Sequence, residues 1–177
     1  MSHDVSFAMK THRGFTLIEI IAVLVLTAIL VVTGVQLLSN IMLGYVSAEQ
    51  TYQNTQKAQV ALDRIVVELT SVASMGAITA CSQSNITYTD GTNIFMIYQT
   101  GSVVLYNMGG VVGTQDYTLM DDVDQNNGLR FTCYDSYTGT SVAASVGDIK
   151  LVDVALRFSV GQDLFKDLST QVAIQSY

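Results

Sequence analysis

The chain has 177 residues and a formal net charge of −7, with 49% hydrophobic and only 13% charged residues. Residues 15–177 carry six Lys or Arg against fourteen Asp or Glu, a net charge of −8, which excludes a nucleic-acid interface because that needs clustered basic side chains. Both histidines, His3 and His12, lie in the first fourteen residues, so the rest of the chain has no Ser-His-Asp or Cys-His catalytic site and no His-based metal site. We expect no cofactor.

An apolar segment, residues 15–38, follows a short polar leader, residues 1–14. As a helix this segment would be about 36 Å long, enough to cross a hydrocarbon core of about 30 Å. Lys10, His12 and Arg13 precede it, and the positive-inside tendency predicts a cytoplasmic N-terminus. The chain is therefore expected to be a single-pass protein of the inner (cell) membrane with its C-terminal part in the periplasm or otherwise outside the cytoplasm.

The small residue Gly14 comes before the apolar segment, whereas a secretory signal has its cleavage site after a shorter apolar stretch. Cleavage between Gly14 and Phe15 would remove the leader and leave the apolar helix on the mature chain.

Glu19 is the only charge in residues 15–38. A carboxylate near the middle of a bilayer costs about 2.5–3.5 kcal/mol, and less near the interface, so Glu19 is expected to have a partner. That partner could be the Phe15 amine of the same chain or of a neighbouring copy, and the second pairing would make Glu19 a device that sets register. The alternative is a plain membrane anchor.

The order Gly14, Phe15, then Thr-Leu-Ile and Glu19 resembles the start of the type IV pilin and pseudopilin family. The resemblance implies cleavage after Gly14 by a prepilin peptidase, N-methylation of Phe15, and a role for Glu19 in docking the subunit into a growing filament. Residues 15–38 would form the filament core, and the partners would be other pilin or pseudopilin subunits and a membrane assembly platform. The sequence lacks the proline that many members carry within this segment and has Gln36 there instead, with Gly34 nearby as a soft spot of the helix.

A weaker likeness to minor pilins and to J-type minor pseudopilins of type II secretion extends over residues 60–69 and 129–136. Helical spacing of apolar residues continues from Leu62 to Ala73, and Arg64 and Glu68 form an i,i+4 pair on the opposite side, worth a few tenths of a kcal/mol. Residues 39–76 are expected to continue the helix as an amphipathic segment that ends near Gly76.

Residues 77–177 are expected to form a β-rich globular head. Seven segments are rich in β-branched and aromatic residues, and turn residues such as Asp90, Gly91 and Gly101 separate the first of them. The sequence thus predicts an α+β fold in which a long N-terminal helix packs on an antiparallel β-sheet, as in a pilin. The expected strands are residues 85–89, 94–98, 103–106, 117–120, 129–134, 149–158 and 171–174.

Cys81 and Cys133 are the only cysteines. Outside the cytoplasm they could form a disulfide that ties the loop after the helix to a central strand, at a gain of about 4 kcal/mol, or they could remain two thiols.

Asp122, Asp124 and Asn126 resemble the start of a calcium loop. The positions where such a loop needs Gly and Glu are occupied by other residues, so this segment is also interpreted as an acidic turn before a strand.

These observations favour a structural subunit without enzymatic activity, a minor pilin or minor pseudopilin of a type IV pilus or of a type II secretion pseudopilus. One alternative is a periplasmic binding or adhesion module on a simple anchor, for which neither cleavage nor Glu19 would matter. Another is an anchored hydrolase, which would have to work through an acidic pair such as Asp148 and Asp153. The motif is shared by secretion, adhesive, twitching and DNA-uptake systems and does not distinguish among them.

Overall fold

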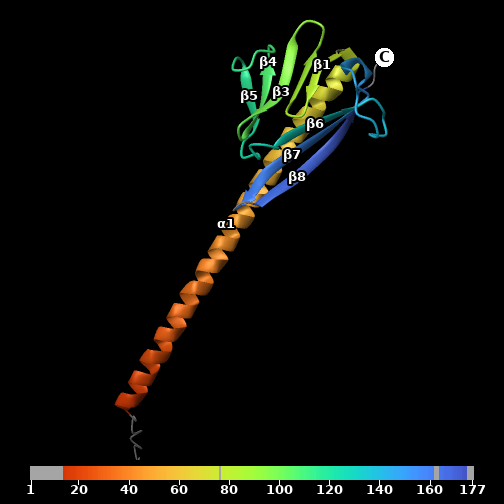
Figure 1. The fold of residues 1–177 in the computed structure, drawn as a ribbon. Helices are drawn as coiled ribbons and strands as arrows, with labels where there is room; N and C mark the ends of the chain where they lie inside the picture. Colours follow the sequence, from red (N-terminus) through yellow and green to blue (C-terminus); the bar gives the residue numbers. More distant parts are fainter. Residues whose placement is uncertain (1–13, 76, 162–163, 175–177) are drawn as a thin grey trace, which may run out of the picture. The chain divides into compact units, whose positions relative to one another are not determined.

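The computed structural model describes residues 14–75, 77–161 and 164–174 (Figure 1). Of residues 72–75 it describes the backbone alone. The chain divides into two compact units, residues 1–45 and 46–177, and each is described by itself. Helix α1, Leu17–Met75, runs through the boundary between them. The expected helix is confirmed, and it is unbroken at Gly34 and at Gly44. The expected stop signal, Gly76, lies outside the described residues.

Five strands of the second unit form one antiparallel meander in the order β1-β2-β3-β4-β5. The register pairs Thr89 with Ile94 around the Asp90–Gly91 turn, as expected for a tight hairpin. Strand β1 was expected to be a loop, and that expectation is wrong. Its small residues carry little strand signal, but it pairs with β2 along its length around an irregularity between Ile78 and Ala80. The strands are β1 Ala77–Ser82, β2 Asn85–Thr89, β3 Ile94–Thr100, β4 Val103–Met108 and β5 Asp116–Met120.

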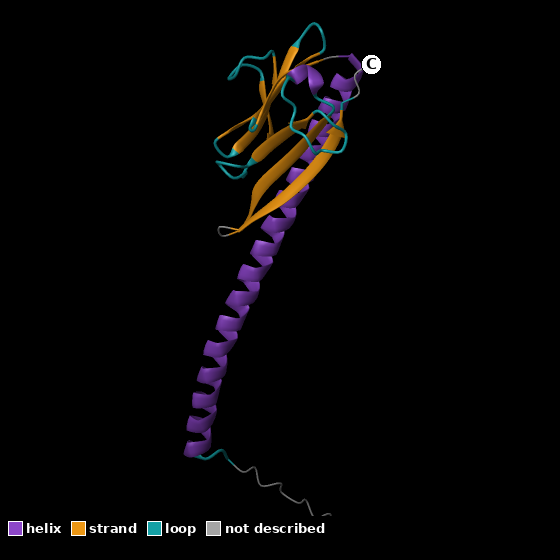
Figure 2. Cartoon of the chain, turned by 45° about the vertical axis from the view of Figure 1, so that its right-hand side comes forward, coloured by secondary structure: helices purple, strands orange, loops and turns teal. Residues whose placement is uncertain are grey.

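Three further strands form a second antiparallel sheet in the order β6-β7-β8. They are β6 Leu129–Tyr134, β7 Leu151–Gly161 and β8 Leu164–Ala173, and η1 Val146–Asp148 is a short 3-10 turn before β7. The head therefore has two sheets where one was expected. Figure 2 shows the strands of both sheets beside the C-terminal half of α1. The expected alternation of β6 is confirmed, since Leu129, Phe131 and Cys133 are buried while Arg130 is exposed.

The core of the second unit lies between one stripe of α1 and the inner faces of both sheets. The helix contributes five buried apolar residues at helical spacing. The expected stripe is confirmed at Leu62, Ile65 and Leu69, whereas its last members lie among residues 72–75, whose side chains are outside those described. Strand β7 contributes every second residue from Val152 to Phe158, all of them fully buried. The helical members are Ala58, Ala61, Leu62, Ile65 and Leu69.

A buried amide organises the loop between β4 and β5. Asn107 is fully buried, and its Nδ2 donates to the backbone carbonyls of Val111 and Thr114 and to Oδ1 of Asp116. A side chain at Gly110, whose φ is +69°, would place its Cβ 2.6 Å from the Ile94 side chain, so only glycine fits. The hydrogen bond from Asn107 lowers the pKa of Asp116 below its usual value, since it favours the charged carboxylate.

Candidate functional site

The N-terminal end of α1 carries the expected processing residues. Gly14 and Phe15 precede the helix, and Phe15 is 75% exposed. The carbonyl of Thr16 accepts the first helical hydrogen bonds, from the N–H of Glu19 (3.1 Å) and of Ile20 (3.3 Å). A Cβ at Gly14 would meet nothing within 4 Å, so no packing within the described chain requires glycine there. Lys10, His12 and Arg13 belong to the leader, residues 1–14, and lie in its part outside the described residues.

Glu19 lies in the first turn of α1, where the helix dipole favours a negative side chain. It is the only charged residue between Gly14 and Glu49. Within the described part of the chain, none of the ion pairs includes Glu19. The fold thus places one exposed carboxylate at the start of a long apolar surface.

That apolar surface surrounds the helix on all sides. Every residue from Gly14 to Gln50 is exposed, so the chain's own core does not use this part of α1. Among the described residues, α1 is the helix long and apolar enough to cross a membrane. The hydroxyl of Thr27 donates a hydrogen bond to the carbonyl of Val23, and the hydroxyl of Thr33 donates one to the carbonyl of Ile29, each one turn earlier in the helix. Both hydroxyl groups therefore have a hydrogen-bond acceptor without water. A helix that is apolar all round requires lipid or other helices as its surroundings.

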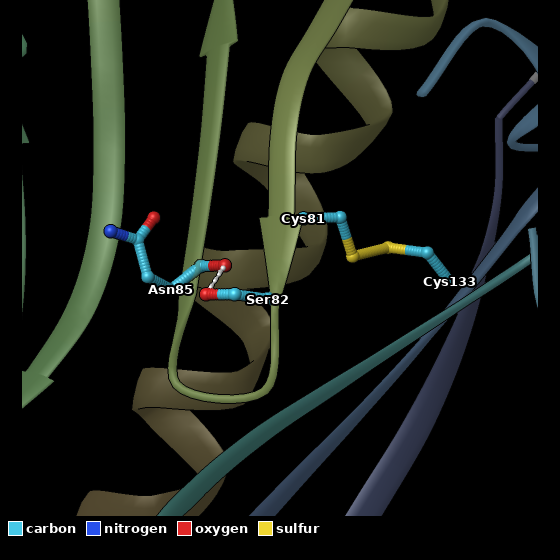
Figure 3. Close-up of a disulfide and its surroundings, with 4 residues drawn as sticks. All are labelled: Cys81, Ser82, Asn85 and Cys133. Atoms are coloured by element: carbon cyan, nitrogen blue, oxygen red, sulfur yellow. Dashed lines mark hydrogen bonds between the residues drawn. A yellow bond between two sulfur atoms is a disulfide. The ribbon is translucent and has the colours of Figure 1, made fainter. Parts of the chain in front are cut away.

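Cys81 and Cys133 form a disulfide whose Cα atoms are 6.6 Å apart (Figure 3). The bridge joins β1 of the five-stranded sheet to β6 of the three-stranded sheet, and so it links two strands rather than a loop and a strand. Beside it, the hydroxyl of Ser82 donates to the carbonyl of Asn85 across the β1–β2 turn, as Figure 3 shows. Another link between the sheets is the N–H of Phe131, which donates to the carbonyl of Gln83.

The acidic segment before β6 folds as a turn held by Asp124. Its Oδ1 accepts the N–H of Asn126 (2.9 Å) and of Asn127 (3.3 Å), and its Oδ2 lies 3.3 Å from Nε of Arg157. The hydrogen bond from Asn126 lowers the pKa of Asp124 below its usual value. These contacts give Asp124 a structural role in the turn. The backbone of Asp122, in the same acidic segment, has a left-handed conformation with φ +58°. In the described chain no three or more acidic, His or Cys side chains form a group that could hold a metal ion.

Glu68 connects α1 to the five-stranded sheet, a role that the sequence did not indicate. Its Oε2 accepts the hydroxyls of Tyr88 (2.9 Å) and Tyr106 (3.2 Å), and its Oε1 pairs with Arg64. The pair of Arg64 and Glu68 is confirmed, but its expected position on the side away from the sheets is wrong, because the Glu68 side chain is only 14% exposed. Burial, and then the charge of Glu68, raise the pKa of Tyr88 above its usual value.

Two polar side chains of α1 hold the end of β7. Thr51 Oγ1 donates to the carbonyl of Val160, and Asn54 Nδ2 donates to the carbonyl of Ser159, each at 2.8 Å. Both helix residues lie in a polar stretch with no apolar periodicity, so the sequence carried no signal for these contacts.

Comparison with known proteins concerns the N-terminal end. Residues 9–35 match the model of the prokaryotic N-terminal methylation motif. The motif and the exposed apolar helix support a membrane-anchored protein of the kind that a prepilin peptidase processes. They support membership of the type IV pilin and pseudopilin family, which confirms the resemblance seen in the residues from Gly14 to Glu19. Searches of curated proteins and of solved structures find no match.

Proposed function

We propose that the chain is a minor pilin or minor pseudopilin, cleaved between Gly14 and Phe15 and assembled into a type IV pilus or a type II secretion pseudopilus. The observation that carries this proposal is a helix with every residue exposed from its start to Gln50 and a single carboxylate in its first turn. Such a surface needs lipid before assembly and neighbouring helices afterwards. The motif match at residues 9–35 supports the same function.

Cleavage supplies the chemistry that Glu19 needs. Hydrolysis of the Gly14–Phe15 peptide bond leaves a carboxylate on Gly14 and a new amine on Phe15. The neutral amine then attacks the methyl group of a sulfonium donor, which leaves as a thioether, and the nitrogen gives up one proton. This amine is the nearest cation that the mature chain can offer to Glu19, and it becomes available at each neighbouring copy. Pairing between copies removes the cost of an unpaired acid in lipid, which is about 2.5–3.5 kcal/mol at the bilayer centre and less near the interface, only at the correct stagger. Glu19 therefore sets the axial register of assembly.

The orientation follows from the same segment. The cationic leader stays in the cytoplasm, and the head, which contains the disulfide between Cys81 and Cys133, lies in the periplasm or outside the cell. The work of the subunit is then structural: α1 packs laterally in the filament, and the head presents a surface to its neighbours.

Intact mass of the mature chain tests the processing step. We expect loss of residues 1–14 and gain of one methyl group in cells with the peptidase, and no change in cells without it. A chain that keeps its leader in both strains would contradict the proposal and favour the alternative of a binding or adhesion module on a plain anchor.

Replacing Glu19 with Ala tests the assembly step. We expect recovery of the variant in the sheared filament fraction to fall about tenfold, as a loss of about 1.4 kcal/mol would give, with processing unchanged. Glu49→Ala is the matched control, since Glu49 is exposed on the same helix and accepts a hydrogen bond only from the nearby Gln53 among the described contacts. Equal recovery of both variants would rule out a role for Glu19 in register.

A further inference from the structure

The paired ends of β7 and β8 lie beside the start of the polar part of α1. Thr51 and Asn54 donate hydrogen bonds to the carbonyls of Val160 and Ser159, as described above. A Cβ at Gly161, the last residue of β7, would lie 3.4 Å from Oγ of Ser47. This end of the three-stranded sheet is therefore held at the level of Ser47 along the helix.

Ser47 follows directly after the apolar part of the helix. Residues 15–46 contain one charge, Glu19, and as helix they extend about 48 Å. A bilayer with its headgroups is about 40–45 Å thick, and a helix tilt of about 20° brings the two lengths into agreement. When α1 spans the membrane, Ser47 is thus placed at the outer headgroup region.

The side chains at the start of β8 suit that region. Leu164 is 66% exposed and Phe165 is 43% exposed. The guanidinium of Arg157 lies 5.3 Å from the ring centre of Phe165, and Lys166 is exposed next to it in the sequence. Phe and Leu side chains next to Lys and Arg are characteristic of protein elements that lie in the membrane interface, where the basic side chains keep their charged ends in the headgroup region.

We propose that Leu164 and Phe165 make a second, peripheral contact with the phospholipid surface while the subunit is still held in the membrane. This inference rests on the proposed function, because the lipid surface that Leu164 and Phe165 contact belongs to the bilayer in which α1 is anchored. Leu164 pairs with Gly161 next to Ser47, and Phe165 pairs with Ser159 next to Asn54, about 10 Å further along the helix. Release of this contact accompanies extraction of the subunit into a filament.

The absence of Trp from the sequence permits a direct test. Leu164→Trp and Phe165→Trp each create a chain with a single Trp at an exposed position. The full chain is placed in phosphatidylcholine nanodiscs that contain lipid with a nitroxide on its headgroup, and quenching of Trp fluorescence is measured. We expect quenching of both variants.

Two further variants serve as controls. Tyr137→Trp replaces a 57% exposed residue beyond the end of β6, where Tyr134 pairs with Leu151. That end is the opposite end of β7 from Gly161, about 33 Å away along the strand, so the headgroup nitroxide should leave this Trp unquenched. Leu30→Trp, in the apolar part of α1, should be quenched by a nitroxide deep in the acyl chain.

The outcomes separate the two proposals. If Leu30→Trp is quenched by the deep probe but Leu164→Trp and Phe165→Trp lose no more fluorescence than Tyr137→Trp, the peripheral contact is wrong and anchoring by α1 stands. If Leu30→Trp is not quenched, anchoring itself fails, and the contact fails with it. Circular dichroism verifies that each variant is folded, and the use of two reporters at the start of β8 guards against one of them misfolding.

Discussion

Reduction of the disulfide between Cys81 and Cys133 should destabilise the head strongly. The two cysteines are 52 residues apart, and the chain-entropy model gives about 4 kcal/mol for closing a loop of this length in the unfolded chain. The bridge joins the two sheets, whose other links include the hydrogen bond from Phe131 to Gln83. With a denaturant slope of about 2 kcal/mol per M, the urea midpoint should fall by about 2 M.

The assay is equilibrium urea unfolding of the full chain in detergent, followed by far-UV circular dichroism with and without reductant. Equilibrium conditions matter because Cys133 is only 6% exposed and reacts mainly when the head opens. The control is the double variant Cys81→Ala, Cys133→Ala, whose midpoint should not depend on reductant. A fall of less than about 0.5 M in the wild type would refute the reasoning, since the constraint on the unfolded chain would then be offset elsewhere.

Two further predictions concern the head. Tyr88→Phe removes one hydrogen bond to the partly buried Glu68 and should lower the free energy of unfolding by about 1–2 kcal/mol. The control is Tyr137→Phe at an exposed position, which should change the free energy of unfolding by less than about 0.5 kcal/mol. Equal effects of the two variants would contradict a structural role for Glu68. The pKa of Asp116 in the folded chain is lowered chiefly by the hydrogen bond from the amide of Asn107. The charged form of Asp116 therefore stabilises the fold at pH values above the unfolded pKa of about 3.9. This stabilisation is lost as the pH falls through the lower pKa of the folded chain. Thermal unfolding between about pH 2 and 6 should therefore show a weaker acid dependence in Asp116→Asn than in the wild type, and an unchanged acid limb would refute this role.

Much of the fold follows from local pattern. The helix from Leu17 to Met75, the hairpin at Asp90 and Gly91, and the alternating strand β6 all have signals within a few residues, either in periodicity or in turn chemistry. Strand β8 was expected only over residues 171–174, but it begins at Leu164. Its first half mixes apolar and charged residues without a regular alternation and is mostly exposed, because it lies in an edge strand whose pairing with β7 supplies the stability that its side chains do not.

The contacts of the helix with the head could not be predicted in the same way. Glu68 looked like one half of an exposed pair, since a helical wheel shows only neighbours on the same helix. Its burial depends on Tyr88 and Tyr106, which come from two different strands and meet at one carboxylate only after the sheet has formed. The same holds for Thr51 and Asn54 at the end of β7.

The sequence by itself determined the motif at the N-terminal end of this protein: Gly14 at the proposed cleavage position, the acid at Glu19 and the apolar helix behind them, because such a motif is a property of one contiguous segment. Only the tertiary structure decided that the strands divide into two sheets, that Cys81 and Cys133 covalently join them, and that the ends of β7 and β8 lie beside Ser47. These features depend on which segments pair across long separations in the chain, and side-chain patterns within one segment carry no record of that choice.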